Sequence, residues 1–245
     1  MRLELDYIAA SLESLEETII QKFIDRAQFM RNQTVYRKGE NGFTDGGDYS
    51  LLELRMRYHE DMDALFGRFL TPEERPFTAN GRKHPARKVT TEHRGLRIED
   101  YNRVNLTKDV WDSYIALIPE ICEEGDDGNY GSSVEHDVAA LQAISRRIHF
   151  GAFYVAESKF LSSPDKYTEL IKEGNRDKLL SALTREEIEK QILKRIETKV
   201  ETIQAMVNTK VRKVIPSRVI MNYYKNTIIP VTKTGEIKYL LMREI

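Results

Sequence analysis

The chain has 245 residues, and 40% of them are hydrophobic, which is enough for a substantial core. Its 38 Lys and Arg residues nearly balance its 39 Asp and Glu residues, so no overall field favours nucleic acid or an anionic membrane. Any anion site must therefore be local. The single cysteine, Cys122, excludes an internal disulfide and a cysteine-based zinc site, and it indicates a buried packing thiol in a reducing compartment.

The N-terminal sequence MRLELDYIAASLESLEE carries acids where a signal peptide needs a cationic start and an apolar run. No window reaches the ~18 apolar residues of a membrane span. We therefore expect a cytoplasmic protein that does not enter a membrane.

Apolar residues recur at intervals of three and four through long segments that are poor in glycine and proline, so the chain is expected to be nearly all-α. A first helix is predicted over residues 5–31. Its apolar stripe consists of Ile8, Leu12, Leu15, Ile19, Phe23 and Ile24. After the glycine-rich loop GENGFTDGGDYS, a second helix is predicted from Tyr49 to the stop signal at Thr71 and Pro72.

The segment from Pro76 to Asn105 has charges and turn residues but no clear period, which predicts an irregular connection with short helices. Residues 110–122 have helical spacing. The polar segment EEGDDGNYGSS that follows is a loop of the kind that often carries function.

A long central helix is predicted next. Ser132 with Glu135 has the spacing of a capping box, and apolar residues keep helical register to Phe160. About 27 residues at ~1.5 Å each span ~40 Å, which is long enough for the spine of a domain.

Three further helices close the chain. Thr184 with Glu187 predicts a second capping box, opening a charged helix through about Val211. Another helix is expected from Pro216 to near Pro230, and a short one in TKTGEIKYLLMREI. No linker is long enough to separate two cores, so residues 1–245 are expected to form a single helical domain.

Common catalytic signatures are absent from the sequence. It has no phosphate-binding glycine loop, no HExxH, no serine elbow and no paired-cysteine site, and its five histidines lie in unrelated settings, so no metal site is expected. His149 is interpreted as structural. The basic run KVRKVIPSR lacks interleaved aromatic residues and is interpreted as a solvated face, so no nucleic-acid partner is expected.

Two cations are placed where the spine helix should be buried. Arg147 and Lys159 lie among Ile148, Phe150, Phe153, Val155 and Phe160, and buried cations need partners. Either they pair with acids such as Glu157 or Glu189, or they form a pocket for carboxylates.

At SRRIHFGAFYVAESKF, residues 145–160, the sequence resembles the eukaryotic-type, all-helical chorismate mutases. Three more segments match that family in the same order: LEETIIQKFIDRAQF, NYGSSVEHDVAALQAIS and IIPVTKTGEIKYLL. The resemblance implies the Claisen rearrangement of chorismate to prephenate in aromatic amino acid biosynthesis, catalysed without a cofactor by a homodimer. Because the reaction is intramolecular, catalysis consists of holding the reactive conformer and stabilising charge on the ether oxygen.

The resemblance also implies roles for individual residues. Arg147 corresponds to the arginine that binds a substrate carboxylate, and Lys159 to the lysine on the ether oxygen. Glu189 corresponds to the acid that binds the substrate hydroxyl, Thr232 to a pocket threonine, and Glu236 to the glutamate that must be protonated. A neutral Glu236 requires burial and favours mildly acidic pH.

The chain departs from the family pattern at three positions. Ala9 stands where the family has an arginine that binds a carboxylate. Arg147 and Lys159 are 12 residues apart instead of about 11, which turns Lys159 by ~100° unless a π-bulge between Ala152 and Val155 absorbs the extra residue. Arg185 replaces a family asparagine or aspartate; it either turns inward as a substitute cation or lies in solvent.

The family's effector pocket for tyrosine or tryptophan at the dimer interface is only partly present. Arg68, Asn129, Gly131 and Ser132 match it, whereas Gly67, Glu135 and Ile215 do not. We therefore expect weak or absent feedback by aromatic amino acids.

Two other functions stay open from the sequence. One is a catalytically inactive relative that keeps the scaffold for binding. The change at Ala9 and the extra residue before Lys159 are changes that such a loss of activity would produce. The other is elimination of pyruvate from isochorismate, which no residue specifically supports. If the chain is an active mutase, its activity is expected to be reduced unless Arg185 compensates.

Overall fold

A computed structural model describes residues 4–78, 85–86, 88 and 95–245, and in these ranges the chain is all-helical with no strand. The predicted fold class is therefore confirmed. The α-helices are α1 Leu5–Arg26, α2 Leu51–Leu65, α3 Thr107–Ile121, α4 Tyr130–Phe150, α5 Ala156–Ser162, α6 Pro164–Glu173, α7 Arg176–Leu183, α8 Glu186–Gln204, α9 Ser217–Tyr223 and α10 Ile229–Met242. Two short 3-10 helices, η1 Gln33–Tyr36 and η2 Tyr101–Arg103, and two π-helical segments, η3 Gly151–Val155 and η4 Tyr224–Ile228, complete the elements.

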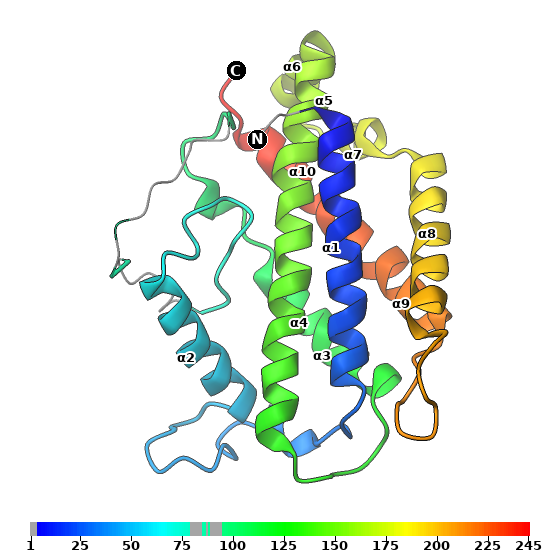
Figure 1. Cartoon of the computed structure of the whole chain (residues 1–245). Helices are drawn as coiled ribbons and strands as arrows, with labels where there is room; N and C mark the ends of the chain where they lie inside the picture. Colours follow the sequence, from blue (N-terminus) through cyan, green and yellow to red (C-terminus); the bar gives the residue numbers. More distant parts are fainter. Residues whose placement is uncertain (1–3, 79–84, 87, 89–94) are drawn as a thin grey trace.

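A central spine is formed by α4, η3 and α5, which follow one another without a break from Tyr130 to Ser162. The spine is somewhat longer than the sequence predicts. In Figure 1 the first helix, α1, runs antiparallel beside α4, and α8 lies on the other side of α1. The α9, η4 and α10 segments form a second continuous rod that crosses the spine at η3.

Small residues allow this crossing to be close. A Cβ on Gly235 of α10 would lie 2.5 Å from the Cβ of Ala152, and one on Gly151 would lie 2.7 Å from the Cγ2 of Thr232. Side chains at these glycines would separate the rods, so both positions hold α10 against the spine.

Several predicted helix starts are wrong. Neither Ser132 nor Thr184 forms a capping box: α4 begins earlier, with Asn129 at its N-cap, and α8 begins later, with Arg185 at its N-cap, and neither cap residue makes a side-chain hydrogen bond. The Asp127 carboxylate accepts from the backbone N–H of Asn129, which fixes the entry to α4. The capping box that does form joins Ser50 and Glu53 at the start of α2.

Side chains that bind backbone groups explain two helix ends. α1 stops at Arg26 rather than Arg31 because the Arg26 guanidinium donates to the carbonyl oxygens of Phe29, Met30 and Arg31. α8 stops at Gln204 rather than Val211 because the Gln204 amide pairs with both backbone groups of Ile215.

The predicted break near Pro230 is also wrong. The π-helical turn η4 ends at Ile228, directly before α10, and Pro230 is the second residue of α10. The widened turn accommodates the proline ring and its missing N–H. The short helices α6 and α7 were not predicted. The predicted connection from Pro76 to Asn105 includes η2 and is otherwise irregular where it is described; residues 79–84, 87 and 89–94 of it lie outside the described residues.

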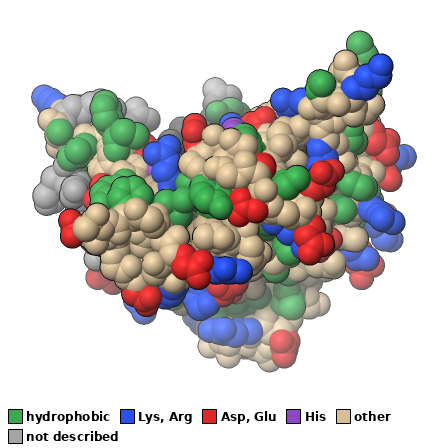
Figure 2. All heavy atoms as spheres, turned by 90° about the horizontal axis from the view of Figure 1, so that it is seen from below, with side chains coloured by type: hydrophobic (Ala, Val, Ile, Leu, Met, Phe, Trp, Pro, Cys, Tyr) green, Lys and Arg blue, Asp and Glu red, His purple; other side chains and the backbone are tan. Residues whose placement is uncertain are grey.

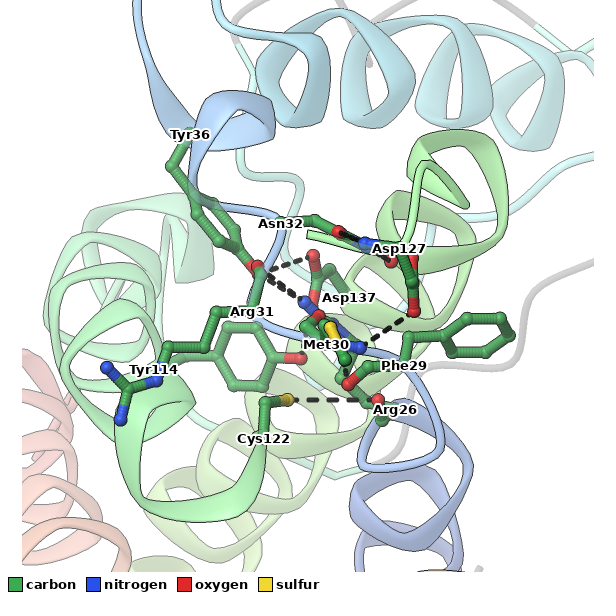
Figure 3. A network of polar contacts seen from close by, with 11 residues as sticks. Arg26, Phe29, Met30, Arg31, Asn32, Tyr36, Tyr114, Cys122, Asp127 and Asp137 are labelled. Atoms are coloured by element: carbon green, nitrogen blue, oxygen red, sulfur yellow. Dashed lines mark hydrogen bonds and ion pairs between the residues drawn. The ribbon is translucent and has the colours of Figure 1, made fainter. Parts of the chain in front are cut away.

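A buried ion pair ties α1 to α4 at one end of the spine (Figure 3). Arg26 Nε lies 2.7 Å from Asp137 Oδ1, and both side chains are fully buried. The hydroxyls of Tyr36 and Tyr114 donate to the same Asp137 carboxylate. Cys122 is 4% exposed beside this network, and burial raises the pKa of its thiol to about 11, so the predicted packing role is confirmed.

The surface carries both signs of charge. On the face in Figure 2, basic and acidic side chains are interspersed, as the near-zero net charge predicts. Lys210 and Arg212 of the basic run are exposed in the loop between α8 and α9. None of the helices in the described ranges combines the length and the apolar run that crossing a bilayer requires.

Candidate active site

A pocket of about 360 Å³ lies between α1, the spine, α8 and α10. Its volume suits a small molecule. The five residues predicted to be catalytic line it together: Arg147, Lys159, Glu189, Thr232 and Glu236. Ala9 and Arg185, two of the three departures from the family pattern, line the same pocket.

The π-helical turn η3 places the two spine cations. It spans Gly151–Val155, which includes the predicted range, and it absorbs the extra residue between Arg147 and Lys159. The prediction of a π-bulge is confirmed. Both cations consequently face α10, where Thr232 and Glu236 are one turn apart.

The cations have different partners on α10. Arg147 Nη1 donates to Thr232 Oγ1 over 3.2 Å, and the Thr232 hydroxyl donates to the Ile228 carbonyl over 2.6 Å. Lys159 Nζ lies 2.9 Å from Glu236 Oε2. Of the acids named for the pairing alternative, neither binds these cations: Glu157 binds Arg243 and Tyr239, and Glu189 binds Lys233.

Arg147 is a buried cation with unused hydrogen-bonding capacity. Its side chain is 4% exposed, and its Nε has no hydrogen-bond partner among the described residues. Burial lowers the pKa of Arg147, since the charged form loses hydration. An anionic group entering the pocket would supply the missing acceptor.

Glu236 is a buried acid at the pocket wall. Burial raises its pKa above the ordinary glutamate value, and the nearby charge of Lys159 opposes part of that rise. The group therefore holds its proton to higher pH than a solvent-exposed glutamate, and in the protonated form it is a hydrogen-bond donor.

The charged wall formed by Glu16, Arg195 and Lys233 was missed by the sequence analysis. Glu16 is fully buried on α1 and is bound by Arg195, at 2.7 Å, and by Lys199, at 3.2 Å. Lys233 Nζ lies 2.5 Å from Glu189 Oε1. An acid between Leu15 and Ile19, two residues of the apolar stripe of α1, was the available signal for Glu16.

The remaining predicted residues lie elsewhere. Arg68, just after α2, donates to the side chain of Gln142 on α4. Asn129, Gly131 and Ser132 are at the start of α4, ten or more residues before Gln142, which is ~15 Å along the helix. Within one chain, therefore, Arg68 and the start of α4 do not form a common site. His149 is buried and neutral, with a pKa lowered to about 3 by burial, and it accepts from the Leu106 N–H.

Among the described residues no cluster of three or more metal-ligating side chains occurs. The pocket instead joins hydrogen-bond donors, cations and one acid of raised pKa. Such a site can bind an anion, fix its conformation and stabilise negative charge that develops on an oxygen atom.

Comparison with known proteins finds close relatives over the whole chain. Chorismate mutase 2 of Arabidopsis thaliana is 36% identical over 255 residues, covering 98% of this chain and 93% of the relative. The chorismate mutase of Schizosaccharomyces pombe is also 36% identical, over 248 residues that cover 99% and 97%. A scan against protein-family models finds no match.

Solved structures agree with these relatives. The Aro7p chorismate mutase of Candida albicans, solved in complex with L-Trp, superposes with a TM-score of 0.91 at 32% identity, over 98% of this chain and 92% of that one. The chloroplast chorismate mutase of Zea mays superposes with a TM-score of 0.86 at 35% identity, over 97% and 94%.

Proposed function

This chain belongs to the eukaryotic chorismate mutases, and we propose that its pocket between α1, the spine, α8 and α10 converts chorismate to prephenate. The enzyme is thus an isomerase of aromatic amino acid biosynthesis. The observation that carries the proposal is the π-helical turn η3, because it returns Lys159 to the side of the spine that Arg147 occupies.

The proposed roles are those that the family resemblance implies, and the contacts support them. Arg147, fixed by Thr232, binds one carboxylate of the substrate with the donors it leaves unused. Lys159 and the protonated Glu236 donate to the ether oxygen, on which negative charge develops as the C–O bond breaks. Glu189, held by Lys233, accepts from the substrate hydroxyl.

The proposed mechanism needs no nucleophile. The C–O bond breaks and the C–C bond forms within one molecule, so the enzyme lowers the barrier by selecting the folded conformer and by placing donors on the ether oxygen. The pocket walls supply these two functions.

Prephenate formation by the Arg147→Ala variant tests this proposal against a neighbouring control. Arg146 precedes Arg147 on α4 but is exposed, so Arg146→Ala removes the same charge outside the pocket. We expect Arg147→Ala to lower kcat/KM by about a hundred-fold or more and Arg146→Ala to leave it within about two-fold. Equal effects of the two substitutions would count against the proposed site.

We further propose that the whole chain is one domain and that two copies form a homodimer. α2 exposes Tyr58, Met62 and Leu65 at 59%, 50% and 40%, and these residues recur along one helix face. Because Arg68 and the start of α4 lie apart in one chain, any effector site that uses both requires two protomers. With Gly67, Glu135 and Ile215 in place, we expect millimolar tyrosine or tryptophan to change the rate less than several-fold.

The proposed compartment is the cytoplasm, because Cys122 is a free thiol and reducing compartments favour free thiols. Fractionation of the host cell tests this assignment.

A further inference from the structure

Five cations line the pocket in the part of the chain that the structure describes, and three of them already contact acidic side chains. The engaged pairs are Lys159 with Glu236, Lys233 with Glu189, and Arg195 with Glu13 and Glu16. Arg147 and Arg185 are the other two. The pocket therefore has two cations that remain available for an anionic ligand.

Arg185 lies at the solvent-exposed side of this pocket. Its side chain forms no hydrogen bond or ion pair with any residue in the described ranges, and the residue is exposed. Arg147, by contrast, is buried on the spine, and its hydrogen-bond partner among the described residues is Thr232. One available guanidinium is thus fixed and the other is free to turn.

The backbone that carries Arg185 is held by the pocket itself. Lys159 Nζ donates to the Leu183 carbonyl over 3.0 Å, and Lys233 Nζ donates to the Thr184 hydroxyl over 3.1 Å. Both residues directly precede Arg185, which is the N-cap of α8. The corner between α7 and α8 is therefore anchored to two lysines of the site, and only the Arg185 side chain must move to reach a ligand.

The α1 wall offers no alternative. Its described lining residues are Leu5, Asp6, Ile8, Ala9, Leu12, Glu13 and Glu16, so this wall contributes acids and no cation. Ala9 contributes only a methyl group to this lining. A second anionic group of a ligand must be bound from the α8 side.

We propose that Arg185 binds the second carboxylate of the substrate dianion, closing over the pocket from α8 and supplying the charge that α1 lacks at Ala9. This inference rests on the proposed function, since chorismate carries two carboxylates and Arg147 accounts for one. A guanidinium forms two parallel hydrogen bonds to a carboxylate, which suits a residue that must both bind and orient.

The test compares Arg185→Ala and Arg185→Lys with Lys194→Ala, which removes an exposed cation of α8 that does not line the pocket. We measure kcat/KM for chorismate and, by calorimetry, chorismate affinity at two salt concentrations. Arg185→Ala should lower kcat/KM by about 10- to 100-fold, weaken binding and reduce its salt dependence. Arg185→Lys should give kcat/KM and affinity values between those of the wild type and Arg185→Ala. Lys194→Ala should have the values of the wild type.

A second cation at position 9 distinguishes carboxylate binding from a structural effect. Ala9→Arg should restore most of the loss in Arg185→Ala and add little to the wild type. If Arg185→Ala matches the wild type, or if a folded and active Ala9→Arg enzyme gives no restoration in the double variant, the inference is overturned.

The calorimetric measurement of chorismate affinity distinguishes failure of this inference from failure of the proposed function. A wild-type protein that binds chorismate but forms no prephenate contradicts the function, while loss of that binding in Arg185→Ala still supports the role of Arg185. A wild-type protein that does not bind chorismate overturns both.

Discussion

At the scale of single residues, the two cations that the spine contributes to the pocket have different partners. Lys159 lies 2.9 Å from the carboxyl group of Glu236, whereas among the described residues the buried Arg147 has the Thr232 hydroxyl as its hydrogen-bond partner. Burying a cation is costly unless it is paired, so a substrate carboxylate that binds Arg147 offsets part of the cost of its burial.

The protonation of Glu236 gives a prediction for the pH profile. Because burial raises its pKa, the protonated donor is fully present at low pH and is lost as pH rises through the raised value. We expect kcat to fall with rising pH above the ordinary glutamate range, and Glu236→Gln, whose amide always donates, to flatten that decline. A wild-type profile that rises with pH would contradict this role. Stability changes with pH in the same direction. Because the pKa of Glu236 is raised in the folded state, its contribution to the free energy of unfolding is fully present at low pH and is lost as pH rises through the raised pKa.

The ion pair of Arg26 and Asp137 gives a prediction for stability. Asp137→Ala leaves a fully buried guanidinium without its carboxylate and removes the acceptor of two tyrosine hydroxyls. We expect the free energy of unfolding to fall by about 3–5 kcal/mol. Denaturant unfolding measures it, with Glu135→Ala, an exposed acid on the same helix, as the control. Similar losses in both variants would show that the network contributes little.

At the scale of elements, the site depends on where two rods cross. The π-helical turn η3 sets the rotation of α5 relative to α4, and the glycines at 151 and 235 let α10 approach the spine. Arg147 and Lys159 then meet Thr232 and Glu236 one helical turn apart. Helix rotation and helix contact together assemble the pocket.

An insertion tests this geometry. One alanine added between Val155 and Ala156 should turn Lys159 by ~100° away from Glu236. We expect kcat/KM to fall by about a hundred-fold or more while helical content, measured by circular dichroism, is kept. An alanine inserted between Asn208 and Thr209, in the loop after α8, is the control. A folded insertion variant with full activity would show that Lys159 is not needed.

The sequence predicted helices well and their ends less well, for identifiable reasons. Apolar periodicity located α1, α2, α3, the spine and α8, because packing faces determine that pattern. Ends set by distant contacts, such as Gln204 with Ile215, leave no local signal. The pocket residues on the spine were found because two cations interrupt an apolar stretch, whereas Lys233 was missed because its partner Glu189 is 44 positions away.

At the scale of the whole molecule, the exposed face of α2 makes an assembly prediction. We expect a dimer by sedimentation analysis and a shift toward monomer in Met62→Glu, since a charge in an apolar interface opposes association. Met206 is 93% exposed in the loop after α8, so Met206→Glu is the matched control. A monomeric wild type, or a dimer that is indifferent to Met62→Glu, would contradict the proposed interface.

The central claim is that this pocket rearranges chorismate through a protonated Glu236. The most direct measurement is the loss of chorismate absorbance with purified protein from about pH 5 to about pH 8, with the product identified and Glu236→Ala measured in parallel. Our account predicts prephenate, formed fastest at the acidic end, and a loss of about a hundred-fold or more in Glu236→Ala. A folded protein that leaves chorismate unchanged, or one whose rate is insensitive to Glu236→Ala, would contradict it.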